Sequence, residues 1–559
     1  MMKYRLALST MEMDRKKYLT LLGLTIGIFG IAFPALTWFS IGPYMEVTSL
    51  FAVFASFYFL VMVVVIWPYV SASQRRIKID RTMPSYITEL AALATSDMGF
   101  ERIFHILSQK KEYGPLSKDS EKIYRLMKLY NVSVSVGCAF VASQSPSKLE
   151  NDFFSRLSHA IDVGEPLDRF MNNEHDVLMD EYVLRCESSL KDVDFLKEIY
   201  TGAVTALIFI CVFVAIIPLL SQTMVDELMI GVVVGFVIME ALFVVLILSK
   251  VPKEDIWYPF RQKIKGRLVS DKDRILILSL FVAIAGIFLL FITLKDFDLP
   301  PMLMAASIFM PVLIPGILMM REEKRIEKRD EIFGAFIRSL GRSSSVSGQT
   351  MPGAVKNLAV HKFGPLTSMV ENLSKRLNMY IDPRKSWEHF AAESSSNLIK
   401  RFSSIYMECV LSGSKPEETS SFISNNLFKV LTIRKKRLSI SSGFYGVFYG
   451  IMVSLAFTLW ITIGIIEYMN NVVTNLNVDT SGIPTGGFLD SIFNASYNVD
   501  LLNIMVFSII IIHAFFSAIM IPIVKGGSIA TTGVHFVLLI WVGAVSGYIV
   551  DLVLNVLMM

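Results

Sequence analysis

The stretch YTGAVTALIFICVFVAIIPLL, residues Tyr200–Leu220, contains no Asp, Glu, Lys or Arg. A run of about 20 apolar residues can cross the roughly 30 Å hydrocarbon core of a bilayer as one helix. Its apolar and polar residues do not alternate with period two, which disfavours a transmembrane strand. Because a helix is the remaining way to satisfy every backbone group in lipid, the stretch predicts a membrane-spanning helix.

Eight further stretches of the 559-residue chain have the same character. They are Tyr18–Ser40, Val47–Pro68, Met229–Leu248, Ile275–Leu294, Pro301–Met320, Ser442–Ile466, Leu501–Val524 and Gly533–Val556. The sequence therefore predicts an all-α polytopic membrane protein with about nine transmembrane helices, located in the cell membrane.

The placement of positive charge predicts the orientation of these helices. With the N-terminus in the cytoplasm, the outward segments are Ile41–Glu46, Ser221–Leu228, Lys295–Leu299, Glu467–Asp500 and the C-terminal end, and of the 53 Lys and Arg residues only Lys295 falls in them. Lys and Arg concentrate in cytoplasmic segments of membrane proteins. We therefore expect a cytoplasmic N-terminus and an extracellular C-terminus.

Two long regions between the apolar stretches show helical periodicity and are predicted to be cytoplasmic helical bundles. The predicted order is a tail with the first two helices (1–68), a first cytoplasmic domain (69–199), two helices (200–249), a basic cytoplasmic loop (250–274), two helices (275–320), a second cytoplasmic domain (321–441), the seventh helix (442–466), an extracellular loop (467–500) and the last two helices (501–559).

The two predicted domains are related by an internal repeat. Tyr113-Gly114-Pro115-Leu116-Ser117 matches Phe363-Gly364-Pro365-Leu366-Thr367 at an offset of 250 residues. The same offset pairs Tyr130 with Tyr380, Phe140 with Phe390 and Pro166 with Pro416. Repeats of this kind indicate duplicated structural units. Two predicted membrane helices precede and two follow each domain, so both copies share one orientation.

Three basic segments are candidate contact sites. Arg75, Arg76 and Lys78, and likewise Arg434, Lys435, Lys436 and Arg437, lie where anionic lipid headgroups are expected, and each charge contributes about 1 kcal/mol at such a surface. The loop 250–274 carries Lys253, Arg261, Lys263, Lys265, Arg267 and Lys272 with interspersed aromatic residues. Its composition suits lipid or an acidic protein partner equally.

Glu240 is the one carboxylate near the middle of a predicted membrane helix, which makes it a candidate intramembrane polar site. A relay for ions or protons and a merely hydrogen-bonded, interior-facing glutamate are both open, and His513 and His535 are possible partners. Pairs of glycines four apart permit close helix packing, either within the chain or in a homodimer. They are Gly23/Gly27, Gly231/Gly235, Gly446/Gly450 and Gly543/Gly547.

Motifs of catalysis are missing from the sequence. It contains no GxxxxGK[ST] phosphate loop, no GxSxG and no HExxH, so we predict no catalytic, cofactor or metal site. The four cysteines show no CxxC spacing and are expected to be reduced or buried. No nucleic-acid-binding motif accompanies the basic charge. Asn494 begins an Asn-Ala-Ser sequon in the outer loop and is a candidate glycosylation site.

The helix that opens the first domain resembles a known family. Met83-Pro84-Ser85-Tyr86-Ile87-Thr88-Glu89-Leu90-Ala91-Ala92-Leu93-Ala94-Thr95-Ser96 is similar to the small-residue helix of the type II secretion system F-domain family. The Ser-Gly pair usual after that helix is loosened here, since Gly99 follows Ser96-Asp97-Met98, and Phe333–Gly348 is more divergent. The length, the doubled domain and the nine helices look most like the archaellum platform branch.

The resemblance implies a membrane platform that couples a cytoplasmic hexameric secretion-type ATPase to assembly of the archaellum and to motility. Its partners would be that ATPase, the filament base, motor accessory proteins and lipids, with Lys253, Arg261, Lys263, Lys265, Arg267 and Lys272 as the ATPase dock. A platform of an archaeal type IV pilus or secretion machine is the alternative. A secondary transporter fits less well, because transport does not require large cytoplasmic domains.

Overall fold

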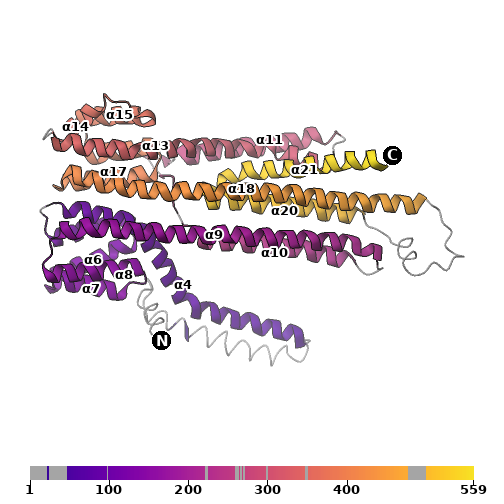
Figure 1. Ribbon diagram of the computed structural model, residues 1–559, viewed down its shortest axis with the longest axis horizontal. Helices are drawn as coiled ribbons and strands as arrows, with labels where there is room; N and C mark the ends of the chain where they lie inside the picture. The colour runs from indigo at the N-terminus through magenta and orange to yellow at the C-terminus, as the bar shows by residue number, and fades with distance from the viewer. Residues whose placement is uncertain are drawn as a thin grey trace. The chain divides into compact units, whose positions relative to one another are not determined.

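The computed structural model describes residues 20, 22–23, 47–96, 98–220, 225–252, 254–258, 263–264, 267–268, 271–297, 300–346, 350–475 and 499–558. Its α-helices in chain order are α4 (Val47–Ala94), α5 (Phe100–Gln109), α6 (Pro115–Tyr130), α7 (Val134–Gln144), α8 (Lys148–Val163), α9 (Leu167–Leu220), α10 (Val225–Lys250), α11 (Asp271–Leu294), α12 (Pro301–Ile308), α13 (Leu313–Val346), α14 (Met351–Leu358), α15 (Thr367–Asn378), α16 (Pro383–Ser394), α17 (Asn397–Leu411), α18 (Pro416–Asn475), α20 (Val499–Lys525) and α21 (Thr532–Met558) (Figure 1).

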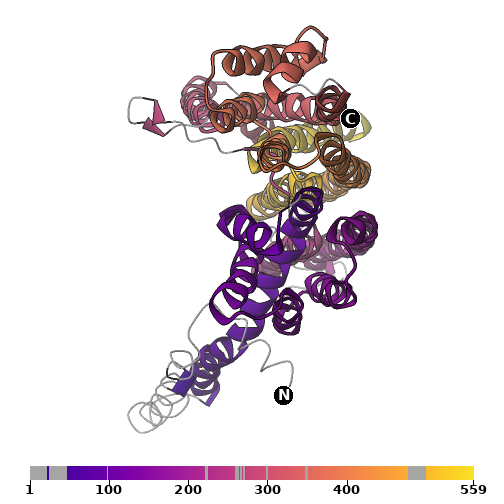
Figure 2. The same ribbon diagram turned by 90° about the vertical axis from the view of Figure 1, so that its left-hand side faces the viewer.

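Short elements connect these helices. Single 3-10 turns occur at η3 (Lys111–Tyr113), η4 (Met310–Val312), η5 (Gly364–Leu366) and η7 (Ile529–Thr531). The two-residue strands β1 (Lys263–Ile264) and β2 (Arg267–Leu268) pair antiparallel, with Lys263 opposite Leu268. Both strands lie between α10 and α11. Figure 2, in which most of the long helices are seen nearly end-on, shows the strand arrow standing clear of the neighbouring helices.

Seven helices are long and apolar enough to cross a membrane within the described part of the chain. They match the seven stretches predicted from Tyr200 onward in the same order; the first span ends at Ile216, four residues before the predicted end, and the other six contain their stretches completely. Of the other two predicted spans, Tyr18–Ser40 falls almost wholly outside the described residues, and Val47–Pro68 forms the first part of α4. The protein is thus an all-α, multi-pass membrane protein, as predicted.

The order of elements repeats. Helices α4 to α9 correspond one by one to α13 to α18. Backbone residues in the left-handed region recur at matching places, with Gly114 at φ +57° and Gly364 at +52°, and Gly164 at +81° and Gly413 at +91°. Glycine suits both pairs because it has no Cβ to clash there.

The same serine–aspartate hydrogen bond, which we call the clamp, occurs in both repeats. The Ser147 hydroxyl donates to Asp80, and the Ser396 hydroxyl donates to Asp330. Each serine also accepts a backbone N–H at the start of the following helix, α8 or α17, which satisfies one of the donors left free at a helix N-terminus. The clamp therefore fixes the entry of the same helix in each repeat.

The clamp also shows that the repeat offset changes along the chain. Asp80 and Asp330 are 250 residues apart, whereas Ser147 and Ser396 are 249 apart. Consistently, Phe140 is 43% exposed while Phe390 is fully buried. These two phenylalanines, which the sequence pairs at an offset of 250, are therefore not structurally equivalent, because the offset here is 249. Val141, which is buried, corresponds to Phe390.

By its contacts the described chain divides into two compact units. The first unit comprises the residues up to Tyr182 with Ile337–Leu358 and Arg401–Asn426, and the second comprises Val183–Phe336, Ala359–Lys400 and the residues from Leu427 onward. Segments of both repeats thus share the first unit. There the Asn426 amide donates to the Pro84 carbonyl at 2.9 Å, and Arg401 donates to Ser85 at 3.1 Å.

Small residues permit close helix contact in the first unit. A Cβ atom built on Gly341 of α13 would lie 2.0 Å from the Ser420 Oγ atom and 2.7 Å from the Pro416 carbonyl oxygen. Ala91 and Ala92 of α4 are likewise buried. The helices could not approach this closely with larger side chains, which gives a physical reason for the small residues in the opening helix.

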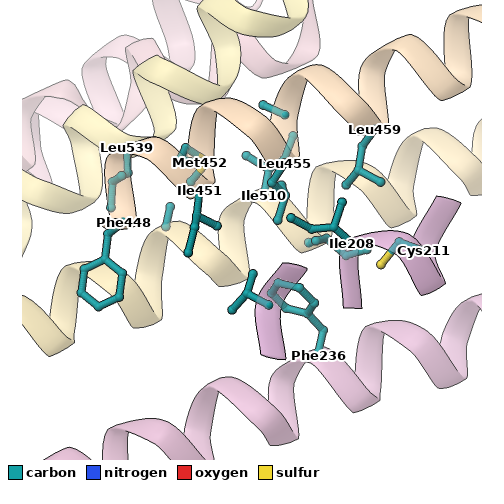
Figure 3. Close-up of a cluster of buried hydrophobic side chains, with 14 of the residues drawn as sticks. Ile208, Cys211, Phe236, Phe448, Ile451, Met452, Leu455, Leu459, Ile510 and Leu539 are labelled. Carbon is teal, nitrogen blue, oxygen red and sulfur yellow. The ribbon is translucent and has the colours of Figure 1, made fainter. Parts of the chain in front are cut away.

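The core of the second unit is the membrane bundle. Helix α20 lies beside both α10 and α21 (Figure 1). Figure 3 shows Ile208 and Cys211 of α9, Phe236 of α10 and Met452 and Leu455 of α18 meeting in one buried cluster. All four cysteines of the chain are free and buried, as predicted.

A buried carboxyl group in the first unit gives a pH-dependent prediction. Burial and the neighbouring charge of Asp119 raise the pKa of Glu150 to about 8, and Asp119 itself is held by Arg75 at 2.7 Å. The folded state thus favours the protonated form of Glu150. Its contribution to stability is complete below the unfolded pKa of about 4.3 and is lost as the pH rises toward 8.

Glu150→Gln should therefore nearly equal the wild type in melting temperature at pH 4 and exceed it at pH 9. The difference in unfolding free energy should grow by at most about 1.4 kcal/mol per pH unit in between. Thermal unfolding of the full chain in detergent at pH 4, 7 and 9 measures this. A difference that stays constant with pH would contradict a neutral Glu150, and Glu121→Gln on the exposed surface is the control.

Candidate functional site

The predicted basic dock is only partly within the described residues. Lys263 and Arg267 lie in the two strands of the β1–β2 hairpin, and Lys272 is the second residue of α11. The side chains of these three residues are not described, and Lys253, Arg261 and Lys265 lie outside the described residues, as does Asn494. The role of the loop as a dock stays a prediction.

The segment that leads into this hairpin is attached to the turn between α16 and α17. Trp257 forms a β-bridge with Ser396. The Tyr258 N–H donates to the Ser395 carbonyl and the Asn397 N–H donates to the Ile256 carbonyl, both at 3.0 Å. The Trp257 side chain is buried with Ile256 against α13. The base of the basic loop is therefore fixed to the second repeat by backbone and side-chain contacts.

A buried ionic network lies beside this attachment. Arg434 of α18 donates to Asp330 of α13 at 2.6 Å and to Glu254 of the loop at 2.5 Å. Arg437, one turn further along α18, donates to the Val524 carbonyl at the end of α20 at 3.3 Å. The network thus joins the loop, two long helices and the end of a third helix. We call Glu254, Asp330, Arg434 and Arg437, with Glu323, the ionic hub.

Glu323 extends the ionic hub toward the last helix. It accepts hydrogen bonds from the Trp257 indole N–H at 3.4 Å and from the backbone N–H of Ser528, and Lys525 lies 3.8 Å away. Three carboxylates, Glu254, Asp330 and Glu323, therefore face three cations, Arg434, Arg437 and Lys525. Buried charges that are balanced and hydrogen-bonded in this way avoid the large penalty of an unpaired ion.

The turn Gly526-Gly527 follows α20 and accommodates the hub. Gly526 has φ +85°, and a Cβ atom there would lie 2.6 Å from the Arg437 guanidinium. A Cβ atom on Gly527 would lie 2.8 Å from the Glu323 carboxylate. Glycine is needed at both positions because any side chain would displace a buried charge.

Each of the two predicted lipid-facing clusters contains both buried and exposed residues. Arg434 and Arg437 are buried in the ionic hub, and Arg75 is largely covered by its ion pair with Asp119. These three arginines are structural, because a side chain enclosed by protein carboxylates does not face headgroups. The exposed members Arg76, Lys78 and Lys435 remain candidate lipid or partner contacts. Lys436 also remains a candidate, but it is half-buried and lies 2.9 Å from Glu187.

A second polar cluster lies inside the membrane bundle, and all its members are fully buried. Glu240 of α10 is 2.8 Å from the Nδ1 atom of His513 on α20, and the Tyr200 hydroxyl of α9 donates to Glu240 at 2.9 Å. Ser517 is 3.3 Å from the same hydroxyl. His513 is therefore the partner of Glu240, whereas His535 instead contacts Tyr449 at 3.2 Å.

This intramembrane cluster satisfies a buried carboxyl group with protein partners. A carboxyl group without partners costs several kcal/mol in a low-dielectric interior, and here the Glu240 side chain is contacted by His513 and Tyr200. Phe448 packs edge-on against Tyr200 and follows Arg437 on α18 by about 17 Å of helix. The cluster thus joins three membrane helices well inside the bundle, separately from the hub.

The surroundings of the predicted glycine pairs differ in how closely other atoms approach. Gly543 and Gly547 pack within the chain, because a Cβ atom on either would lie 2.8 Å from Ile510 or Trp460. The described surroundings leave open space at Gly231, Gly235, Gly446 and Gly450. The homodimer prediction is therefore not supported by the last pair and stays a prediction for the others.

Sequence reasoning did not find the acidic members of the hub. Asp330 could have been noticed, because Asp80 stands at the same place in the first repeat. Glu254 and Glu323 carry no comparable signal, since each lies in a charged segment where many pairings are possible. Tyr200 was placed at the start of a membrane helix, but its hydrogen bond to Glu240 could not be foreseen from spacing.

Comparisons with known proteins agree on one family. The family model for the type II secretion system (T2SS), protein F, matches residues 86–217. A protein named flagella accessory protein J from Methanocaldococcus jannaschii is 31% identical over 88% of this chain and 87% of its own length. Its namesake from Methanococcus voltae is 29% identical over 88% of both chains. No solved structure matches the chain.

Proposed function

The chain belongs to the flagella accessory protein J family, and from this premise we propose that it couples a cytoplasmic hexameric secretion-type ATPase to archaellum assembly and motility. Members of this family are membrane platform proteins of archaellum or type IV pilus-like machinery. The proposal assigns ATP hydrolysis to the partner and force transmission to this chain.

The ionic hub is the observation that carries the proposal. A platform must pass a displacement from a soluble partner into helices that cross the membrane. Arg434 contacts the base of the basic loop through Glu254 and the second repeat through Asp330, while standing on a helix that continues into the membrane bundle. Arg437 adds the end of α20. A push on the loop would therefore reach α13, α18 and α20 together.

Continuous helices extend this connection in both repeats. Helix α9 runs from Leu167 to Leu220 and α18 from Pro416 to Asn475, so each links a soluble segment to a membrane segment without a break. Packed helices move as rigid elements between discrete arrangements. Such helices suit a platform that changes state when a motor acts on its cytoplasmic side.

The proposal includes the predicted orientation, with both helical repeats and the basic loop in the cytoplasm and the C-terminus outside. The confinement of Lys and Arg to one set of segments supports it. A platform of a type IV pilus with the same layout is the alternative, and the two similar proteins, both named flagella accessory protein J, favour the archaellum.

Charge reversal in the hairpin tests the docking part of the proposal. The combination Lys263→Glu, Lys265→Glu and Arg267→Glu should weaken co-purification of the ATPase at least tenfold, because electrostatic complementarity governs such encounters. The melting temperature should not change. The combination Lys148→Glu, Lys356→Glu and Lys362→Glu alters the net charge equally at exposed positions elsewhere. Equal recovery of the ATPase with both triple variants would reject the loop as the dock.

A further inference from the structure

A cavity of about 640 Å³ lies within the membrane bundle of the second unit, lined by residues of α12, α18, α20 and α21. Trp460 of its lining stands on α18 about 35 Å of helix beyond Arg437 of the ionic hub. Asn503 stands near the start of α20, whose other end contacts the hub. The cavity therefore lies at the helix ends far from the hub, toward the end marked C in Figure 1. We call it the outer cavity, because the proposed orientation places this end outside.

The lining of the outer cavity is largely apolar. Ile463, Ile504 and Phe507 supply apolar surface, and Trp460 and Tyr548 add two further rings. Such rings also attract ammonium and guanidinium groups. Cavities of about 300–1,000 Å³ with apolar walls and a few polar groups are typical of ligand sites. The outer cavity thus has the size and the lining of a binding site.

The polar groups of the lining lack complementary partners within the described residues. Glu467 of α18 is half-buried and accepts only from the Asn503 amide at 3.3 Å, and no ion pair there involves Glu467 or Asp551 of α21. The Trp460 Nε1 atom is buried and has no hydrogen-bond acceptor in the same set of residues. Carboxylates beside apolar walls interact strongly with a nearby cation. The outer cavity therefore suits an apolar ligand that ends in a positive charge.

Neither the chain itself nor a phospholipid supplies such a ligand well. The segment 467–500, which joins α18 to α20, contains no Lys, Arg or His. The one cation of the outward segments is Lys295, which does not line the cavity and is followed by Asp296 and Asp298, so a second copy would bring net negative charge. A phospholipid carries a phosphate, which two carboxylates repel. The matching charge therefore comes from another protein.

We propose that the outer cavity binds an apolar membrane helix of a filament subunit through a positive charge at the outer end of that helix. Glu467 and Asp551 receive the charge, and the apolar walls receive the side chains beside it. Lys and Arg are uncommon on the outer side of membrane proteins, so this charge distinguishes the cargo from most other membrane helices. The inference rests on the proposed function, because it takes the cargo to be the subunit of the filament that the platform assembles.

A charge-preference experiment tests the two carboxylates. The full-length protein in nanodiscs is titrated with two leucine-rich transmembrane peptides that differ only in a terminal Lys or Gln. The wild type should bind the Lys peptide at least tenfold more tightly. Glu467→Gln with Asp551→Asn should bind both peptides equally, with an unchanged melting temperature. Asp296→Asn, which removes an exposed acidic group outside the lining, should keep the preference. Equal binding of both peptides to the wild type would overturn the inference.

Photo-crosslinking in filament-forming cells identifies the occupant. A benzophenone amino acid replaces Tyr548, which lines the cavity and is 51% exposed. An adduct with the filament subunit that disappears in the Glu467→Gln, Asp551→Asn variant supports the inference. The same probe in place of Ile549, which is 43% exposed but outside the lining, should give no such adduct. Adducts with lipid or a second copy alone, or none, would overturn the inference.

Recruitment of the ATPase separates this inference from the proposed function. The Glu467→Gln, Asp551→Asn variant should co-purify with the ATPase as the wild type does, because the changes are far from the hub and the basic loop, while cells that carry it form few or no filaments. If the wild type recruits the ATPase but shows no charge preference, the inference fails alone. If the wild type recruits no ATPase, the proposed function fails, and the peptide titration and the adduct still decide the inference.

Discussion

Arg434→Met is expected to lower the free energy of unfolding by about 3–5 kcal/mol, because breaking a buried ion pair leaves charge uncompensated. The two carboxylates that lose their partner are Asp330, which is fully buried, and Glu254 at the base of the basic loop. Thermal unfolding in detergent and the yield of folded protein measure the change. The same variant should abolish filament assembly even where enough protein folds.

A matched variant tests the electrostatic reason. Adding Asp330→Asn and Glu254→Gln to Arg434→Met removes the stranded charges and should recover most of the lost stability, since buried ion pairs can be replaced by neutral groups at little cost. Filament assembly should stay impaired, because the loop no longer has a charged link to α18. Lys435→Met, at an exposed neighbour, is the control. Equal stability of Arg434→Met and Lys435→Met would disprove the hub's role.

Trp257→Ala is expected to abolish filament assembly while the ATPase is still recruited. Trp257 is buried at the base of the basic loop, bridges to Ser396 and donates to Glu323 at 3.4 Å. Truncating a buried tryptophan costs about 3–5 kcal/mol of local packing, so the loop should detach from α13 and α17. The hairpin charges that attract the partner would remain. Binding and force transmission would then separate.

Two assays measure this separation. Co-purification with the ATPase should match wild type, and electron microscopy of cells should show few or no filaments. Trp257→Phe keeps most of the apolar volume and loses only the indole N–H, so it should keep filaments. Normal filaments with Trp257→Ala would show that the loop does not transmit force. Parallel loss of recruitment would show that the anchor itself forms the dock.

The sequence alone determined the membrane helices and the duplication, because both depend on local patterns. A charge-free run such as Tyr200–Leu220 must satisfy its backbone internally in lipid, whatever surrounds it. The turns at Gly114 and Gly364 demand a left-handed residue in each copy. Such signals are carried by a few consecutive residues, so no tertiary contact is needed to read them.

Tertiary structure decided which charges are buried in the fold and which are exposed at its surface. Arg434 and Lys435 are adjacent in one basic run, yet the first is buried between two carboxylates and the second is exposed. Helix periodicity directs neighbours to different faces, but the sequence does not say which face meets Asp330 and Glu254, which are 104 and 180 residues away. Pairing over such separations depends on how the helices pack, because many arrangements of the same charges satisfy the local pattern equally well.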